Sequence, residues 1–304
     1  MTFTGTRGGT RIDTNDLYIE YRPLLFSLAY RMLGTVMDAE DTVQETFASY
    51  AGLKEVSAIR NPRAYLCKMV TNRCIDFLRS AKQRREVYTG PWLPEPVVWR
   101  NDNDGAGHDP MHELLSRDDL TMAYLFMMET LTPTERAVLV LREAFQYDYG
   151  EIASIVGKTE ANCRKIHSRA KQKVQPEAAD RRVDYEKDQT VLNRFISALS
   201  MGDTNTLLQL LTHDATLLSD GGGKVLAAVN PIVTSARVIA FLQGIVRNSP
   251  SNSTIDVVTI NGQPGLLLKV EDHVVGTVSF EREGERIRRI FMVRNPDKLL
   301  RINP

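Results

Sequence analysis

The sequence predicts a multidomain protein in which two all-α domains precede an α+β domain. Three observations carry this prediction: a helical block over 16–86, a helix-turn-helix pattern over 148–174, and a series of short β-type runs after residue 183. Because single domains usually hold about 100–200 residues, a chain of 304 residues has room for two or three of them.

The expected boundaries follow the changes of pattern along the chain. A flexible tail covers 1–15, the first helical domain 16–87, a linker 88–117, the second helical domain 118–178 and the α+β domain 183–304. We recognise no signal peptide and no apolar run long enough to cross a membrane, so we expect a cytoplasmic protein.

Charge and cysteine content limit the kinds of binding site that we expect. Acidic and basic residues balance at 38 each, which fits a protein whose positive charge is local. Between 158 and 173, six basic residues accompany one acidic residue. The three cysteines lack both CxxC spacing and a nearby pair of histidines, so we expect reduced thiols, no metal and no other cofactor.

The first helical domain contains two long helix-forming stretches. YRPLLFSLAYRMLGTVMDAEDTVQETFASY begins at Tyr21, and its acidic run over 38–41 would favour a helix N-terminus. NPRAYLCKMVTNRCIDFLRSAKQRRE begins at Asn61 and ends in a basic cluster over 82–85. Such a cluster can hold phosphates without reading sequence.

The linker contains the only two tryptophans of the chain, Trp92 and Trp99. Its prolines, glycines and polar residues predict an irregular connection. A fully solvated segment would rarely hold both tryptophans, so we expect the segment to pack on another part of the molecule. The most unusual part of the linker is Trp92-Leu93-Pro94-Glu95-Pro96.

The second helical domain begins with LTPTERAVLVLREAF at Leu131. Thr132 can cap a helix, Pro133 suits its first position, and Glu135 completes a capping box. The apolar residues of this helix form a stripe that has to pack on neighbouring helices or on a partner. The stripe consists of Val138, Leu139, Leu141 and Phe145.

Two shorter helices follow with the pattern of a helix-turn-helix. Asp148 can cap the first, and Gly157 can end it, because glycine readily adopts the left-handed conformation of a tight turn. Thr159 can cap the second helix. Three residues of the second helix recur at three- and four-residue spacing and should face inward: Cys163, Ile166 and Ala170.

The outward face of that second helix suits the major groove of DNA. Arginine and lysine can reach guanine or phosphate, and asparagine can pair with adenine. The alternative is a solvated basic face on an ordinary helix, but the turn, the cap and the small residues at the helix crossing favour DNA binding. The face consists of Asn162, Arg164, Lys165, Ser168 and Arg169.

The last third of the chain predicts helices and then a curved antiparallel sheet, an α+β cone. Helices are expected over about 186–200, over 207–211, and through Phe241 and Ile245. Strands are expected at ATLLSD and KVLAAV, on either side of a glycine run, and then at TIDVVTI, GLLLKV, VVGTVSF and RIRRIFMV. Gly262 and Gly284 should lie in the hairpin turns.

The glycine run is Asp220-Gly221-Gly222-Gly223-Lys224, and it has more glycines than a two-residue hairpin turn requires. Glycine also lets another backbone approach closely. We therefore favour a docking surface, for the helical domains or for the tryptophan segment, over a plain tight turn.

Both helical domains resemble parts of the extracytoplasmic-function sigma factors of bacterial RNA polymerase. The stretches from Tyr21 and Asn61 resemble region 2, whereas LTPTERAVLVLREAF and TEANCRKIHSRAKQKV resemble region 4. The resemblance implies that the protein binds promoter DNA and core RNA polymerase, the latter through its β′ clamp helices and β flap.

Carried over position by position, the resemblance implies three sets of contacts. The clamp helices would be contacted by Asp38, Glu40, Asp41, Gln44 and Glu45. The minus-ten DNA would be contacted by Asn61, Asn72, Arg73, Asp76 and Arg79. A loop over 54–61 would hold a flipped base. The minus-thirty-five DNA would be contacted by the outward face of the recognition helix.

Three shorter motifs resemble the sigma-J-like group of this family, which carries an NTF2/SnoaL-like domain as a C-terminal extension. They are WLPEPV at 92–97, DGGGKV at 220–225 and NPDKL at 295–299. The resemblance implies control in cis by that domain, without a separate anti-sigma protein. The third motif adds four residues to the expected regulatory contacts: Asn295, Pro296, Asp297 and Lys298.

Two other functions stay open. An enzymatic NTF2-like domain would need a general base beside an oxyanion donor, and after Tyr185 the chain has no tyrosine or tryptophan. The polar candidates are His213, Asp214, Asp220 and His273, and the first two should lie in a surface turn. We expect no enzyme, and a pocket for an unidentified small ligand stays an alternative. A ligand-responsive helix-turn-helix repressor would not need the acidic upstream block.

Overall fold

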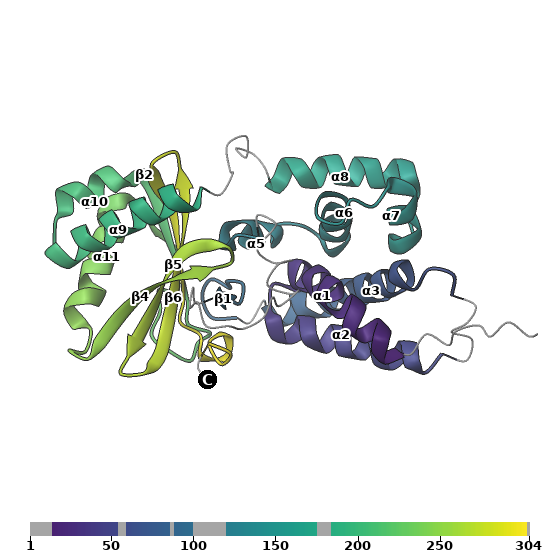
Figure 1. The fold of residues 1–304 in the computed structure, drawn as a ribbon. Coiled ribbons are helices and arrows are strands. Elements are labelled where there is room, and N and C mark those ends of the chain that lie inside the picture. Colours follow the sequence, from purple (N-terminus) through teal and green to yellow (C-terminus); the bar gives the residue numbers. More distant parts are fainter. Residues whose placement is uncertain (1–13, 54–58, 86–87, 100–119, 175–183, 303–304) are drawn as a thin grey trace, which may run out of the picture.

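The structure, a computed structural model, describes residues 14–53, 59–85, 88–99, 120–174 and 184–302. Figure 1 shows α1, α2, α3, α6, α7 and α8 on the right, a sheet with α9, α10 and α11 on the left, and α5 between them beside the sheet. Residues 1–13 of the expected tail, residues 54–58 of the expected loop over 54–61, and the linker after Trp99 lie outside the described residues. The predicted fold class, two all-α domains and an α+β domain, is confirmed.

The first helical domain consists of three helices. They are α1 (Thr14–Leu33), α2 (Val36–Ala51) and α3 (Pro62–Arg85). Gly34 has a φ of +73°, so the tight turn between α1 and α2 requires a residue that tolerates the left-handed region. Asn61 caps α3, because its side-chain oxygen accepts the backbone N–H of Ala64 at 3.1 Å.

The second helical domain confirms the predicted helix-turn-helix and the helix before it. Its helices are α5 (Met122–Met128), α6 (Pro133–Glu143), α7 (Tyr149–Val156) and α8 (Glu160–Val174). Both Thr132 and Asp148 form capping boxes, with Glu135 and Glu151 respectively. Gly157 ends α7 in the left-handed conformation, with a φ of 65°. These local signals place the starts of α6, α7 and α8 and the end of α7 as predicted, but α6 ends at Glu143, so Phe145 of the expected stripe lies beyond the helix.

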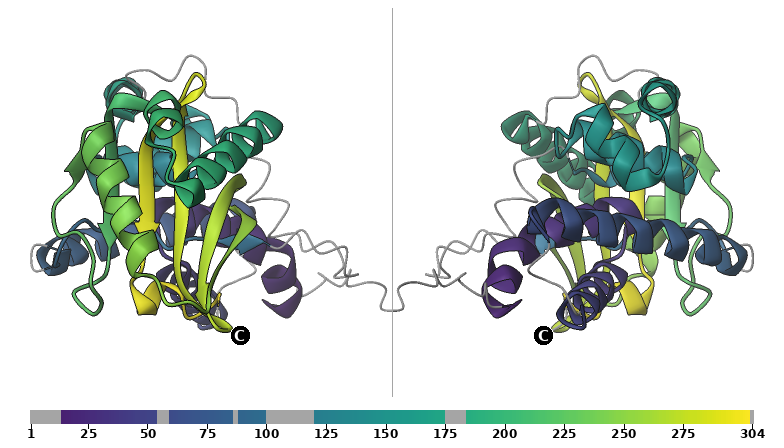
Figure 2. Two further views of the ribbon diagram at one scale, coloured as in Figure 1. Left: turned by 90° about the vertical axis from the view of Figure 1, so that its left-hand side faces the viewer. Right: turned by 90° about the vertical axis from the view of Figure 1, so that its right-hand side faces the viewer.

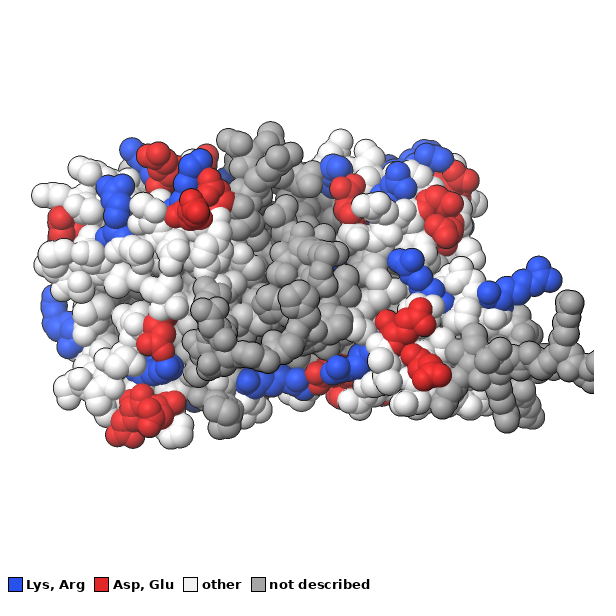
Figure 3. All heavy atoms as spheres, in the orientation of Figure 1, with Lys and Arg blue, Asp and Glu red and all other residues white. Residues whose placement is uncertain are grey.

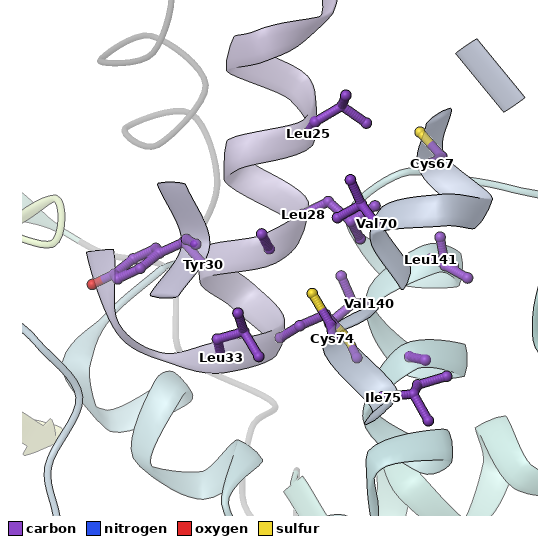
Figure 4. Close-up of a cluster of buried hydrophobic side chains, with 14 of the residues drawn as sticks. Leu25, Leu28, Tyr30, Leu33, Cys67, Val70, Cys74, Ile75, Val140 and Leu141 are labelled. Carbon is purple, nitrogen blue, oxygen red and sulfur yellow. The ribbon is translucent and has the colours of Figure 1, made fainter. Parts of the chain in front are cut away.

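The two helical domains pack around a single hydrophobic core. Figure 4 shows side chains of α1, α3 and α6 lying together, among them Leu28, Val70, Cys74 and Leu141. Each of these four side chains is fully buried. The three cysteines of the chain are free and buried, and burial raises the pKa of each thiol. The sequence predicts two helical domains, but nothing in it indicates that they share a core.

A buried arginine crosses the boundary between the two helical domains. Arg136 of α6 donates from Nη1 to the carbonyl of Met32, in the last turn of α1, at 2.7 Å. It also pairs with Glu129 at 2.8 Å. Burial lowers the pKa of Arg136 to about 10, so the guanidinium keeps its charge at neutral pH. A cation at the carbonyl end of α1 also complements the helix dipole.

The α+β half places three helices against one face of a sheet, as Figure 2 shows. They are α9 (Tyr185–Met201), α10 (Thr204–Leu210) and α11 (Ser235–Asn248). Gly202 ends α9 in the left-handed conformation, with a φ of 69°. The opposite face of the sheet lies toward α5 and the first helical domain, so the sheet is covered on both sides.

The sheet has seven strands across the described residues, in the order β1-β4-β5-β6-β7-β2-β3. The strands are β1 (Val98–Trp99), β2 (Leu211–Asp220), β3 (Ile232–Val233), β4 (Ser253–Ile260), β5 (Gln263–Val270), β6 (His273–Glu283) and β7 (Arg286–Val293). Gly262 and Gly284 lie in hairpin turns with φ of 78° and 59°, as predicted.

Three expectations about this half were wrong. KVLAAV is not a strand, because the N–H groups of Lys224 and Val225 bond back to the carbonyl of Gly221 at 3.0 and 3.3 Å. Those bonds curl the chain, and the partner of β2 on that side is the later strand β3. The sheet is mixed, since β2 runs parallel to β7. His213 and Asp214 lie on β2, where its register with β7 shifts, and not in a turn.

The linker contributes the edge strand β1, which the sequence did not predict. Val98 pairs with Ile260 and Trp99 with Thr259, in antiparallel register with β4. Just before it, the N–H of Val97 donates to the side-chain oxygen of Asn261 at 3.2 Å. The expected packing of the tryptophan segment is therefore observed, and the linker adds to the C-terminal sheet.

The shared core has a testable consequence. We expect Leu141→Ala in α6 to destabilise the protein by about 2–5 kcal/mol, because it leaves a cavity at a fully buried site. Since α6 shares its core with α1 and α3, hydrogen exchange should become faster in all three helices. Leu226→Ala, at a site that is 89% exposed, is the control and should change little. Faster exchange in α6 alone would contradict a shared core.

Candidate functional site

The carboxylate of Asp220, at the end of β2, is fully buried between three segments of the chain. Its oxygens accept hydrogen bonds from the hydroxyl of Tyr88 (2.5 Å), the backbone N–H of Leu93 (2.9 Å), the backbone N–H of Gly222 (3.0 Å) and Nζ of Lys298 (2.7 Å). Burial and the neighbouring carboxylate raise the pKa of Tyr88, so its hydroxyl stays a donor.

Lys298 supplies the positive charge for that carboxylate. It lies on the short helix η3 (Pro296–Lys298) and is itself buried. Its Nζ also donates to the carbonyl of Leu93 and lies 4.2 Å from the ring centre of Trp92 and 5.5 Å from that of Tyr88. A buried charge needs a partner of opposite charge and hydrogen bonds. Asp220 provides the opposite charge, and the linker provides the carbonyl of Leu93.

The glycine run is closely surrounded by other residues of the C-terminal domain. Gly222 has a φ of 63°, and a Cβ there would lie 2.5 Å from the side chain of Asn295. A Cβ on Gly221 would lie 2.6 Å from the carbonyl oxygen of Val225. Asn295 in turn donates to the hydroxyl of Tyr88 at 3.0 Å. Gly222 therefore has to be glycine for the NPDKL segment to fit.

The three motifs thus meet in one place, which we call the Asp220 cluster: Tyr88, Trp92, Leu93, Asp220, Gly222, Asn295 and Lys298. Within the motifs, Lys224 and Asp297 form an exposed ion pair at 2.6 Å at the edge of this cluster. Such exposed pairs contribute little to stability. Leu93 to Pro96 are all buried.

Glu95 connects the same linker to the first helical domain. Its carboxylate accepts the backbone N–H groups of Val36 and Met37 at 2.8 and 3.4 Å, so it caps α2 from outside. Thr35, at the usual capping position, makes no such bond. Burial raises the pKa of Glu95, while the two amides counteract that rise.

Tyr30 and Asn261 join the linker to the other two parts of the molecule. The hydroxyl of Tyr30 donates to the carbonyl of Glu95 at 2.8 Å and accepts from the side-chain amide of Asn261 at 2.8 Å. Burial raises the pKa of Tyr30. Neither residue was predicted from the sequence. The Asn261-Gly262 pair is a turn signal, but nothing in the run SLAYRML predicts that the Tyr30 hydroxyl forms long-range hydrogen bonds.

The expected polymerase-binding residues lie on α2. Asp41, Gln44 and Glu45 are exposed, and Asp38 is half-buried. Glu40 is engaged: Arg301 of the C-terminal domain binds it through both guanidinium nitrogens, one of them at 3.0 Å, and Arg22 lies 3.9 Å away. Arg301 was not anticipated from the sequence.

The expected minus-ten residues lie at the start of α3 and along it. Asn61 is the cap of α3, and Asn72 is exposed. Arg73 pairs with Glu45 at 2.8 Å and donates to Ser49 at 2.6 Å. Asp76 and Arg79 pair with each other at 3.2 Å. The side chains of the basic cluster over 82–85 lie outside the described residues.

The expected minus-thirty-five residues share one exposed face of α8, as predicted. Cys163 and Ala170 are buried on its inner side. Figure 3 shows Lys and Arg side chains over α8, with acidic side chains beside them. Arg164 pairs with Glu160 one turn earlier on the same helix. The five expected residues, Asn162, Arg164, Lys165, Ser168 and Arg169, are all exposed.

The C-terminal domain contains a small pocket between α9 and the sheet. Its lining includes Asp188 and Arg282, which form an ion pair, and Gln263. Its free volume is about 10 Å³, which is room for roughly one water molecule. His213 and His273 are exposed, and Asp220 belongs to the Asp220 cluster. In the described part of the chain, no three metal-ligating side chains gather, and no helix is long and apolar enough to span a membrane.

Family models match both helical domains. The Sigma-70 region 2 model matches residues 17–85, and the Sigma-70 region 4 model matches residues 121–174. The ECF RNA polymerase sigma factor SigJ of Mycobacterium tuberculosis is 38% identical over 228 residues, which cover 74% of this chain and 71% of SigJ. The chain belongs to the ECF RNA polymerase sigma factors. It therefore directs RNA polymerase to promoters, and the sigma factor family is not enzymatic.

The similarity extends into the C-terminal domain. SigI of the same species is 30% identical over 282 residues, which cover 92% of each chain. The crystal structure of Mycobacterium tuberculosis SigJ matches with a TM-score of 0.75 and 28% identity over 94% of this chain and 98% of that one. A match over 94% of this chain has to include its C-terminal domain. The structural similarity to SigJ therefore covers the extension as well as the helical domains.

A pair of glycine variants tests the Asp220 cluster. Gly222→Ala and Gly284→Ala both place a side chain at a positive φ, 63° and 59°, which costs about 1–2 kcal/mol each. Only Gly222→Ala also forces Asn295 to move, whereas nothing lies within 4 Å of a Cβ on Gly284. We expect the free energy of unfolding to fall by about 1–3 kcal/mol more for Gly222→Ala. Equal losses in urea denaturation would mean that the cluster tolerates displacement.

Proposed function

We propose that this sigma factor is held in a closed form by its own linker and C-terminal domain, and that promoter recognition requires this form to open. The closed form is the arrangement in which regions 2 and 4 share one core. The observation that carries the proposal is that core, together with Arg136, which binds the end of α1 from region 4.

The spacing of promoter elements supports the need for opening. Elements about 25 base pairs apart lie roughly 85 Å apart on B-form DNA, at about 3.4 Å per base pair. Helices packed against each other lie only about 8–10 Å apart. Because α6 and α7 pack directly on α3, the recognition helix α8 stays within the width of one domain of region 2. Both elements cannot be read at once in the closed form.

In this proposal each part has a distinct task. Region 2 spans 16–87, the linker 88–117, region 4 118–178 and the regulatory domain 183–304. The exposed side of α2 binds the β′ clamp helices, α3 binds the minus-ten DNA, and α8 binds the minus-thirty-five DNA while region 4 touches the β flap. The protein works in the cytoplasm and needs no separate anti-sigma protein.

The linker contacts support control in cis. The Asp220 cluster holds the linker on the C-terminal domain, while Glu95 and Tyr30 hold it on region 2. Opening is then a population shift, and any partner that binds the open form better favours it. The small size of the pocket supports control by contact over control by catalysis or by a bound organic ligand. Membership of the sigma family leaves no reason to prefer a stand-alone repressor.

Run-off transcription with core RNA polymerase tests this control. Lys298→Met leaves the buried Asp220 without its ion-pair partner, which for buried pairs costs about 3–5 kcal/mol. Lys298→Met also removes the bond to the carbonyl of Leu93 and the contact with the Trp92 ring. Because these contacts with the linker belong to the closed form, we expect more transcript than wild type at limiting polymerase. Lys224→Met removes the exposed pair with Asp297 and is the matched control, with no change expected.

A folded Lys298→Met variant with wild-type or lower output would contradict closure by the C-terminal domain. Asp220→Asn combined with Lys298→Met distinguishes charge from packing, because the double change leaves no unpaired charge. It should lie closer to wild type than Lys298→Met alone.

The recognition face is tested by promoter selectivity. We expect Arg164→Ala and Arg169→Ala to weaken use of the minus-thirty-five element by about 1–3 kcal/mol wherever a base contact is lost. Transcription by the holoenzyme from promoters with intact and scrambled elements measures this. Arg247→Ala, exposed on α11, serves as the control. Unchanged selectivity in both α8 variants would place the DNA on another face.

A further inference from the structure

Tyr149 is the first residue of α7, and its ring meets arginines from two other helices. The guanidinium carbon of Arg164, on α8, lies 4.4 Å from the ring centre. That of Arg142, on α6, lies 4.8 Å from it. Guanidinium groups are attracted to the faces of aromatic rings, and they stack there in a defined orientation. One ring therefore orients side chains of both neighbouring helices.

The hydroxyl of Tyr149 makes a second connection to the recognition helix. It lies 3.1 Å from Nδ1 of His167, one turn beyond Arg164 on α8. The other ring nitrogen of His167 lies 2.7 Å from the carboxylate of Glu143, at the end of α6. Tyr149 thus contacts α8 at two successive turns.

This arrangement restrains the side chain of Arg164. Its side chain is 59% exposed, yet it is held both by the Tyr149 ring and by Glu160. A free arginine side chain samples many rotamers and loses that freedom when it binds DNA. A side chain already held in one orientation loses less, so it binds its base or phosphate more tightly. An exposed ion pair with Glu160 is weak by itself, which leaves the ring as the main restraint.

We propose that Tyr149 is a positioning residue for minus-thirty-five recognition, which holds the Arg164 guanidinium in the orientation that meets the DNA. The inference rests on the proposed role of Arg164 at that element. It gives α7, the first helix of the helix-turn-helix, a role in selecting the DNA sequence in addition to its role in packing. The planar guanidinium is essential to it, because a lysine ammonium at the same position would keep the charge but could not stack.

Selection from a DNA library tests this positioning role. Holoenzyme, assembled from core polymerase and the full chain, binds promoter duplexes with a randomised minus-thirty-five element, and the bound pool is sequenced. The variants are Tyr149→Phe, Tyr149→Ala, Arg164→Lys, Arg164→Ala and the double variant with alanine at both positions. Urea denaturation of each variant checks that it is folded.

We expect Tyr149→Ala and Arg164→Lys to reduce the base preference at the same positions that Arg164→Ala affects, by about two- to five-fold. Tyr149→Phe keeps the ring and should keep that preference. The double variant should be no worse than Arg164→Ala alone, because Tyr149 acts through Arg164. A purely structural tyrosine would instead lower binding to all sequences and add to the effect of Arg164→Ala.

The outcomes separate this inference from the proposed function. If Arg164→Ala changes the preference but Tyr149→Ala and Arg164→Lys do not, the positioning role is overturned and the recognition face stands. An additive double variant overturns the positioning role as well. If Arg164→Ala leaves the preference unchanged, the role of Arg164 and that of Tyr149 are both overturned.

Discussion

The buried ion pair between Asp220 and Lys298 is the constraint on which the arrangement of this sigma factor depends. A carboxylate with no solvent exposure must find its positive charge and its hydrogen-bond donors within the protein. Asp220 finds them on two segments distant in sequence, the linker around Leu93 and the C-terminal NPDKL stretch. If the NPDKL stretch leaves, the buried carboxylate loses its cation, and if the linker leaves, it loses the hydrogen bonds from Tyr88 and Leu93. The pair therefore holds the linker and the end of the chain together on the sheet.

Two further buried charges lie at helix ends, one from the linker and one from region 4. Glu95 places its carboxylate on the first backbone amides of α2, while Arg136 of region 4 places its guanidinium on a carbonyl in the last turn of α1. Each charge complements the dipole of the helix that it meets. The short turn between α1 and α2, at Gly34, is thus held from one side by the linker and from the other by region 4. A displacement of the linker changes the surroundings of α2, the helix that carries the expected polymerase contacts.

This arrangement assigns the C-terminal domain a mechanical role. Its sheet accepts the linker strand β1, its last residues cover Asp220, and its Arg301 binds Glu40 on α2. None of these contacts needs a ligand or a chemical step. Under the proposed function, the domain acts on the equilibrium between closed and open forms, and its effect is limited to the difference in free energy that these contacts make between the two.

The sequence by itself determined the local structure and the family. Capping residues at Thr132 and Asp148, the glycine at 157 and the apolar stripes fixed the helix-turn-helix, because caps and periodicity act within a few residues. The same local signals failed at KVLAAV, an apolar run that reads as a strand until Gly221 curls it. Only the tertiary structure decided the shared core, the burial of Arg136 and the bond between Tyr30 and Asn261, which lie 231 positions apart. The periodicity of a chain specifies which face of an element is buried, but the partner of that face depends on the packing of every other element.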